Sequence, residues 1–175
     1  MIVDSCANCE NGDGLNEWRE FEERVTDELE SLDEELSAIA PLRAKLRQTD
    51  PDPVEPRAAA TTLHAFYNGV ERLLIYVSRR FDDSIPRSMS WHRELLSQAA
   101  EATSGRSAIL SAELHNELLD YLGFRHVFRH NYPATLRWEQ CKPLFHRLEQ
   151  VHKAFRSEVE RFLEDHRPRE DHHDE

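Results

Sequence analysis

The stretch Tyr121-Leu-Gly-Phe-Arg-His-Val-Phe-Arg-His-Asn-Tyr-Pro133 alternates apolar residues with two arginines and two histidines. Its spacing predicts the last turns of a helix that starts after Ser111, because serine is a favoured N-cap residue. The helix is expected to stop near Asn131, since Pro133 pushes Tyr132 out of the α region. One side of this helix then belongs to the protein core, and the other carries groups suited to phosphate chemistry.

Four other segments show the 3–4 spacing of apolar residues that is typical of amphipathic helices. We expect these helices at residues 15–39, 57–81 and 90–104, and in a last segment that has Pro143 in its first turn. Pro41 is expected to end or kink the first of them. No strand-like alternation competes with this pattern. The predicted fold is therefore an all-α antiparallel bundle of about five helices with a long N-terminal helix.

The ends of the chain differ from this helical domain, which is expected at residues 15–165. Residues 1–14 are polar and lack a period, so they are predicted to be a disordered leader. Residues 166–175 are predicted to be a disordered charged tail. The pair Cys6 and Cys9 has the spacing of half a zinc site, but no second pair at finger spacing follows, so no metal site is expected.

The charge is −12 over 175 residues, which argues against indiscriminate nucleic-acid binding. Residues 123–148 are nevertheless basic, with five arginines and lysines against the single acid Glu139, so a phosphate-bearing partner should dock there. The sequence has no 18-residue apolar run and does not open with a signal-peptide pattern. We therefore expect a cytoplasmic protein that does not enter a membrane.

Arg125 and His130 have the chemistry needed to cleave RNA without a metal. Arginine binds phosphate with two parallel hydrogen bonds and keeps its charge, and histidine transfers protons near neutral pH. The spacing Arg-x4-His alone distinguishes nothing, because it occurs five times in the chain. The occurrence at Arg125 differs in having a tyrosine, Tyr132, two residues after the histidine. On residue chemistry alone, catalysis competes with a helix end that simply carries solvated cations.

Helix geometry constrains how the two groups could meet. Arg125 and His130 lie about 140° apart around an ideal helix, and Arg125 falls on the apolar stripe. A charge on such a stripe needs a partner or a purpose. One solution is a two-fold contact that places arginines and histidines of two chains in one cleft. Gly123 would allow the second backbone to approach, and the helix C-terminus should favour a protonated His130, which suits a proton donor.

The segment FRHVFRHNY, residues 124–132, resembles the RX4HXY motif of HEPN-domain proteins, specifically HepT-like toxins. FYNGVERLL (66–74), SWHRELLSQ (90–98) and LRWEQCKPL (136–144) extend the resemblance over about residues 15–165. It implies a HEPN-type helical bundle that forms a homodimer and acts as a metal-independent, cofactor-free endoribonuclease. RNA, with tRNA among its targets, would be cut by its 2′-hydroxyl to leave a 2′,3′-cyclic phosphate, with Arg125 and His130 catalytic.

The resemblance also implies a type VII toxin–antitoxin pair in which an MntA-like nucleotidyltransferase antitoxin transfers AMP to Tyr132. The added charge and bulk would repel RNA from the site. Arg129 and Asn131 are candidate RNA-binding residues. His126 stands where many relatives carry Asn or Asp, and could be a second proton-transfer group, an RNA contact or neither. Two alternatives remain: a non-catalytic HEPN module that binds nucleotides or a nucleotidyltransferase, and a structural adaptor.

Overall fold

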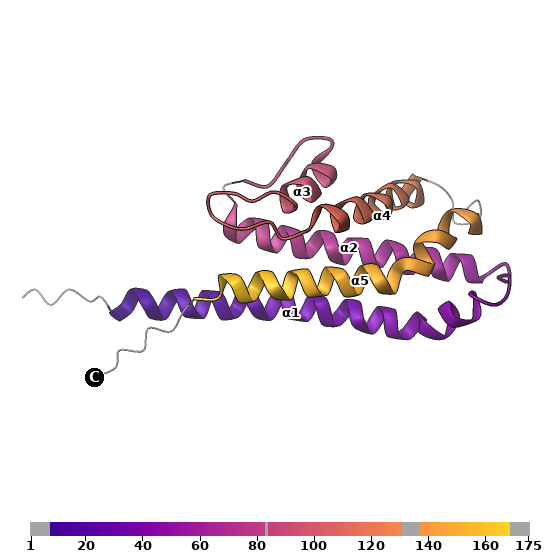
Figure 1. The fold of residues 1–175 in the computed structure, drawn as a ribbon, viewed down its shortest axis with the longest axis horizontal. Helices are drawn as coiled ribbons and strands as arrows, with labels where there is room; N and C mark the ends of the chain where they lie inside the picture. The colour runs from indigo at the N-terminus through magenta and orange to yellow at the C-terminus, as the bar shows by residue number, and fades with distance from the viewer. Residues whose placement is uncertain (1–7, 83, 131–136, 169–175) are drawn as a thin grey trace, which may run out of the picture.

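The computed structural model describes the backbone of residues 8–82, 84–130 and 137–168, and their side chains except those of residues 8–13 and 130. These parts of the chain form five helices and no strand, which confirms the predicted all-α class (Figure 1). The helices are α1 (Asn8–Lys45), α2 (Glu55–Phe81), α3 (Trp91–Ala99), α4 (Ala112–His130) and α5 (Trp138–His166).

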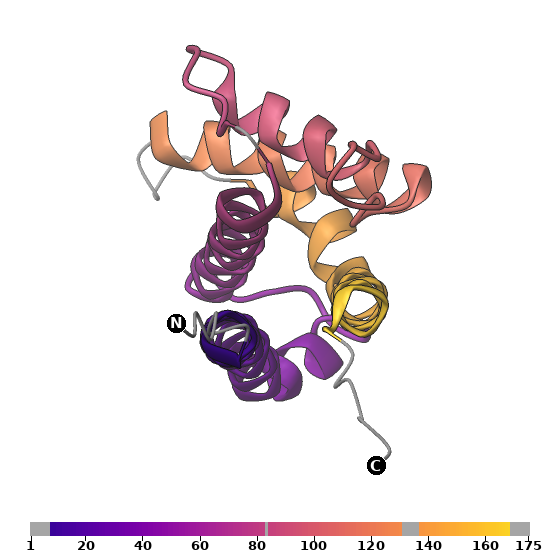
Figure 2. The same cartoon turned by 90° about the vertical axis from the view of Figure 1, so that its left-hand side faces the viewer.

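Helix α2 is the centre of the bundle, because it packs against each of the other four helices. The long helices α1, α2 and α5 run side by side, and α1 extends beyond the end of α5 (Figure 1). The shorter α3 and α4 form a second layer on α2, on the side away from α1 (Figure 2). Helix α2 therefore connects the layer of α1 and α5 to the layer of α3 and α4, which carries Arg125.

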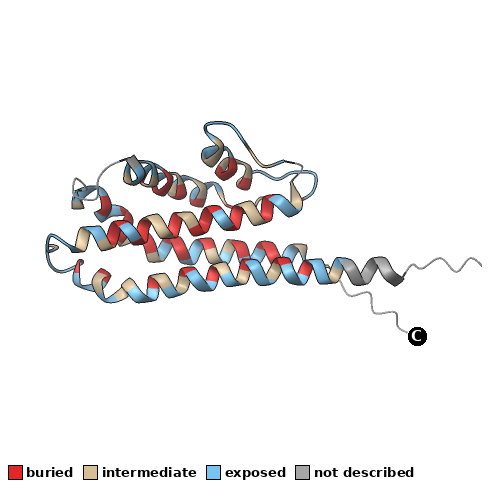
Figure 3. Ribbon diagram, turned by 180° about the vertical axis from the view of Figure 1, so that it is seen from behind, coloured by how far each residue is buried: buried red, intermediate tan, exposed pale blue. Residues whose placement is uncertain are grey.

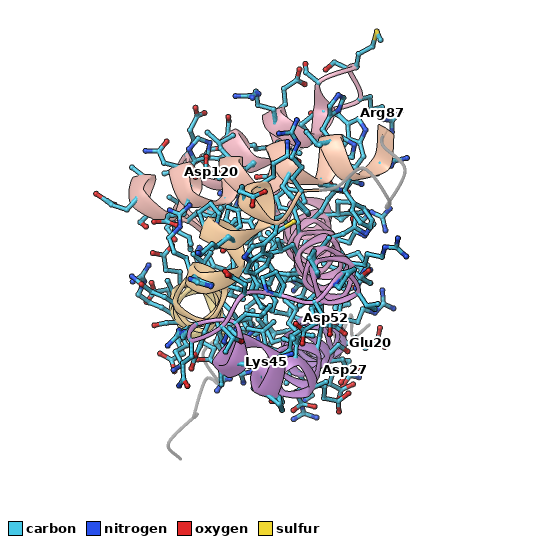
Figure 4. All side chains as sticks on the ribbon, turned by 90° about the vertical axis from the view of Figure 1, so that its right-hand side faces the viewer. Glu20, Asp27, Lys45, Asp52, Arg87 and Asp120 are labelled. Carbon is cyan, nitrogen blue, oxygen red and sulfur yellow. The ribbon has the colours of Figure 1, made fainter. Side chains whose placement is uncertain are left out.

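The sequence pattern of α2 explains its central position. The apolar residues that follow the 3–4 spacing along this helix are all buried: Leu63, Phe66, Tyr67, Val70, Leu73, Leu74 and Val77. Figure 3 shows buried residues along the facing sides of the helices, with exposed residues outside. The labelled acids Glu20, Asp27 and Asp52 lie on the α1 side of the molecule, whereas Arg87 and Asp120 lie on the opposite side (Figure 4).

Some helix boundaries differ from the predicted ones, because prolines and polar segments that were expected to lie at or beyond a helix end lie inside a helix. Helix α1 starts at Asn8 rather than near residue 15, and it continues past Pro41 to Lys45, so the expectation that Pro41 ends it was wrong. Helix α5 starts at Trp138, which places Pro143 in its second turn and not its first. Helix α3 ends at Ala99, several residues before the expected 104.

The predicted cap of α4 is confirmed by a hydrogen bond of 3.2 Å from the Leu114 backbone N–H to Ser111 Oγ. Near the middle of the helix, the Tyr121 hydroxyl donates to the Leu144 carbonyl over 2.9 Å and ties α4 to α5. These contacts fix the rotation of α4 about its axis.

Within the described residues, no helix is long and apolar enough to cross a membrane.

Two helical glycines provide a matched pair of stability predictions. A Cβ atom added at Gly69 would lie 2.6 Å from Leu32 Cδ2, whereas nothing lies within 4 Å of one added at Gly123. We expect Gly69→Ala to destabilise the fold by about 1–3 kcal/mol through overpacking between α1 and α2. Within a single chain, Gly123→Ala should raise the free energy of unfolding by about 0.5–1 kcal/mol through helix propensity, because no atom of that chain occupies the space of the added methyl. Urea unfolding of both variants measures the change in the free energy of unfolding. Equal changes in the two variants would contradict the prediction.

Candidate functional site

Arg125 is held by residues from two other helices. Its Nε donates to Asn68 Oδ1 over 2.8 Å, and its Nη2 donates to Glu71 Oε1 over 3.2 Å. Its Nη1 lies 3.4 Å from Nε2 of His92. The side chain is only 11% exposed. The positive charge of Arg125, which lies on the apolar stripe of α4, is therefore neutralised by Glu71 of α2, and the guanidinium also contacts His92 of α3.

Glu71 is the carboxylate that connects this group. It lies on the core side of α2 and is buried. One of its oxygens accepts from Arg125, and the other accepts from Nδ1 of His92. With a neutral imidazole, the charges of Glu71 and Arg125 cancel, which lowers the cost of placing them away from water. We call Asn68, Glu71, His92 and Arg125 the polar cluster.

The hydrogen bonds determine the tautomer of His92. In the neutral ring, Nδ1 carries the proton because it faces a carboxylate, and Nε2 presents its lone pair to the Arg125 guanidinium. The ring lies against that of Trp91, with centroids 3.7 Å apart. The His92 side chain is 21% exposed. The imidazole is thus fixed in orientation and still reaches solvent.

Asn68 is oriented in turn by His64. Its Nδ2 lies 3.2 Å from His64 Nδ1, and the His64 ring packs on Phe128 with centroids 4.8 Å apart. Burial lowers the pKa of His64, and the nearby charges of Arg125 and Arg129 lower it further. A neutral His64 accepts the amide hydrogen bond, which leaves the Asn68 oxygen directed at Arg125.

The six residues predicted for the site have different outcomes. Arg125 lies in the polar cluster, and His126 and Arg129 are exposed on the same helix. The backbone of His130 forms the end of α4, but its side chain lies outside the described residues, as do Asn131 and Tyr132. Asn68, Glu71 and His92 were not predicted as site residues, although two of the segments quoted for the resemblance contain them.

The basic character expected of residues 123–148 is weaker in the folded chain than in the sequence. Arg147 pairs with Glu117 and Asp120 of α4, at 3.1 and 3.2 Å. Arg125 pairs with Glu71. Arg129, Arg137 and Lys142 are exposed and flank the end of α4 and the start of α5. The surface available to an anion is therefore concentrated around these helix ends.

The arrangement suits phosphate chemistry carried out by side chains alone. Two of the three guanidinium nitrogens of Arg125 are anchored, so the group cannot rotate freely. The imidazole of His92 faces the third nitrogen with its Nε2, 3.4 Å away. Within the described part of the chain, no three His, Cys, Asp or Glu residues are grouped so that they could hold a metal ion.

A comparison with protein families identifies the region from which the cluster comes. The family model described as "HepT-like protein" matches residues 58–166, which is more than half of the chain. The matched region contains all four residues of the polar cluster and the segment from Arg125 to Tyr132. No curated protein and no solved structure matches the chain.

Proposed function

Because the chain belongs to the HepT-like family of HEPN-domain proteins, we propose that it is the cytoplasmic toxin of a type VII toxin–antitoxin system and a metal-independent endoribonuclease. Its substrate is RNA, with tRNA as one candidate. The observation that carries the proposal is the anchored guanidinium of Arg125, which lies beside an imidazole in a cluster of three helices.

The cleavage that we propose is an internal transfer at one phosphate. The 2′-hydroxyl gives its proton to a general base and attacks the phosphorus, the bond from phosphorus to the 5′-oxygen breaks, and the 5′-oxygen leaves with a proton from the His130 imidazolium. The products are a 2′,3′-cyclic phosphate and a 5′-hydroxyl. Arg125 stabilises the charge that develops on the phosphorane oxygens through Nη1 while its other nitrogens stay anchored.

We further propose that the active species is a homodimer in which the C-terminal halves of two α4 helices face each other. Gly123 is exposed, and a Cβ atom there would meet nothing within 4 Å in the single chain, so this part of α4 can accept a neighbouring helix. Two copies of the polar cluster would then border one cleft, with Arg129 of each chain at its rim. RNA would bind between them through its backbone.

The test is cleavage of RNA by the purified full chain in the presence of a metal chelator. We expect fragments that end in a 2′,3′-cyclic phosphate, and a cleavage rate that falls steeply with salt because cationic groups dock the backbone. His130→Ala should remove the activity and leave the dimer intact. Absence of cleavage by the wild-type chain on total RNA would refute the nuclease proposal.

The partner that we propose is an MntA-like nucleotidyltransferase that transfers AMP to Tyr132. We expect Tyr132→Phe to keep RNA cleavage and to resist silencing by this enzyme and ATP, because the acceptor hydroxyl is gone. The mass of the wild-type chain should rise by one AMP unit, and peptide mapping should locate the addition at Tyr132. An adduct found on another residue, or silencing of the Phe variant, would contradict this assignment.

A non-catalytic HEPN module is the second candidate, and the pairing of Arg125 with Glu71 favours it, since the guanidinium charge is already neutralised. Such a protein would bind a nucleotidyltransferase or a nucleotide without cutting RNA. This second candidate function predicts that the wild-type chain forms a complex with the nucleotidyltransferase. It also predicts that RNA stays intact when it is incubated with the chain alone or with the complex.

A further inference from the structure

We propose that His92 is a catalytic residue of this ribonuclease and takes the proton from the attacking 2′-hydroxyl. This inference rests on the proposed nuclease function and deepens it. The sequence leaves the proton acceptor open, with His126 as one candidate, and nothing in the spacing from Arg125 to Tyr132 points to α3. The polar cluster supplies an imidazole from that helix.

The first argument is distance. Nε2 of His92 lies 3.4 Å from Nη1 of Arg125, the one guanidinium nitrogen that neither Asn68 nor Glu71 anchors. A phosphate bound at this nitrogen places the adjoining ribose next to the imidazole. A separation of 3.4 Å is long for a hydrogen bond, so a phosphate oxygen competes readily for Nη1 and leaves the Nε2 lone pair to the 2′-hydroxyl.

The second argument is the state of the ring. Glu71 accepts the Nδ1 proton and Trp91 packs on the ring face, so the lone pair stays on the side of Arg125. When Nε2 gains a proton, the Glu71 carboxylate stabilises the resulting imidazolium. The same division of labour between a carboxylate and a histidine base operates in hydrolytic triads.

The third argument concerns the charges around the imidazole. Among the described residues, Glu71 faces it from α2 and Arg125 faces it from α4. On α3 itself, Arg93 and Glu94 are exposed, and Glu94 accepts hydrogen bonds from Ser88 and Ser90. The imidazole therefore lies between one anion and one cation, and the incoming phosphate adds a second anion.

The step balances with His130 as the acid. The 2′-O–H bond breaks and its proton goes to Nε2 of His92 while the bond from O2′ to phosphorus forms. The bond from phosphorus to O5′ then breaks, and O5′ takes a proton from the His130 imidazolium. The enzyme ends with a protonated His92 and a neutral His130, and exchange with solvent resets both.

The experiment compares His92→Gln with the wild-type chain over a range of pH. The wild-type rate should rise with pH on the acidic side as the base loses its proton. His92→Gln should lower the rate by about 100-fold to 10,000-fold and flatten that acidic limb. His115→Gln is the matched control, since it lies ten residues before Arg125 on α4, about 15 Å along the helix, and should cleave at the wild-type rate.

A substrate with a sulfur atom in place of the bridging 5′-oxygen separates base from acid, because a thiolate leaves without a proton. This substrate should restore cleavage to His130→Ala and should not restore it to His92→Gln. Restoration of His92→Gln would make His92 the acid and overturn the proposal. An acidic limb that disappears in His126→Gln instead would also overturn it.

Failure of this inference and failure of the proposed function give different results. If the wild-type chain does not cut RNA, the nuclease function itself falls. If the wild-type chain and His92→Gln cut equally well, with the same pH profile, the function stands and the role of His92 is refuted. Circular dichroism and gel filtration of His92→Gln should match those of the wild type. If this variant loses rate but its rate still rises with pH on the acidic side, His92 positions other groups, and its role as the general base is refuted.

Discussion

Arg125→Lys is expected to lower the rate of RNA cleavage at least about a hundredfold, the usual effect of losing one donor to a developing negative charge. Lysine keeps the positive charge opposite Glu71, so the fold should be retained. A lysine ammonium also has three N–H donors, but all of them leave one nitrogen, so it cannot span Asn68, Glu71 and a phosphate as the three nitrogens of the guanidinium do. Initial rates at saturating RNA measure the loss, and a variant above one-tenth of the wild-type rate would contradict it.

Removing the charge altogether should affect the fold as well as the rate. In Arg125→Ala, His92 is the partner that the buried Glu71 carboxylate would keep among the residues that the structure describes. We expect a loss of about 3 kcal/mol in the free energy of unfolding, since breaking a buried pair leaves an uncompensated charge.

The double variant Glu71→Gln with Arg125→Met separates the two effects. It should recover most of the lost stability, because neither charge remains, and it should stay inactive in the cleavage assay. If it is as unstable as Arg125→Ala, the loss comes from packing around the arginine and not from the carboxylate. If it cleaves RNA, Arg125 has no part in the reaction.

The helices and the core could be predicted because apolar spacing carries the information locally. In α2, the residues at 3–4 spacing are the ones that are buried, and the Ser111 cap forms as its side chain suggests. Helix ends were less predictable. Pro41 and Pro143 lie inside helices, because a proline near a helix end removes few hydrogen bonds and packing of the flanking turns compensates.

The candidate site was only half predictable. Arg125 stood out as a charge on an apolar stripe, and Glu71 is a charge of opposite sign on the apolar stripe of α2, between Tyr67 and Leu74 in the helical register. Two opposite charges on the apolar stripes of two helices indicate a buried ion pair, so the pairing of Arg125 with Glu71 could have been predicted from the sequence. Asn68 and His92 gave no comparable signal, because their proximity to Arg125 depends on how three helices cross.

A second buried ion pair gives the largest expected effect on stability. Arg106, in the segment between α3 and α4, donates Nε and Nη2 to the two carboxylate oxygens of Asp82 at the end of α2, over 2.9 and 3.1 Å. Their side chains are 0% and 3% exposed. We expect Asp82→Ala to destabilise the fold by about 3–5 kcal/mol, because it leaves a guanidinium buried without its anion.

Asp120→Ala is the matched control for this prediction. Asp120 also pairs with an arginine, Arg147, but the two side chains are 60% and 40% exposed. Its loss should cost less than about 1 kcal/mol, as is usual for exposed pairs. Urea unfolding of both variants at neutral pH measures the difference in the free energy of unfolding. Similar losses in the two variants would show that burial does not make the Asp82–Arg106 pair more stabilising than an exposed pair.

The Asp82 pair should also respond differently from the Glu71 pair when both partners are replaced. Arg106 donates to the carbonyls of Gln98, Glu101 and Ser107, so one guanidinium organises the connection that leads from α3 to α4. Asp82→Leu with Arg106→Met removes both charges but also removes the arginine's hydrogen bonds to these three carbonyls, of which that of Gln98 keeps the Glu101 backbone N–H as a donor. We therefore expect it to recover less than half of the stability lost in Asp82→Ala. Full recovery would mean that water replaces the arginine at all three carbonyls, and that the position of α4 does not depend on it.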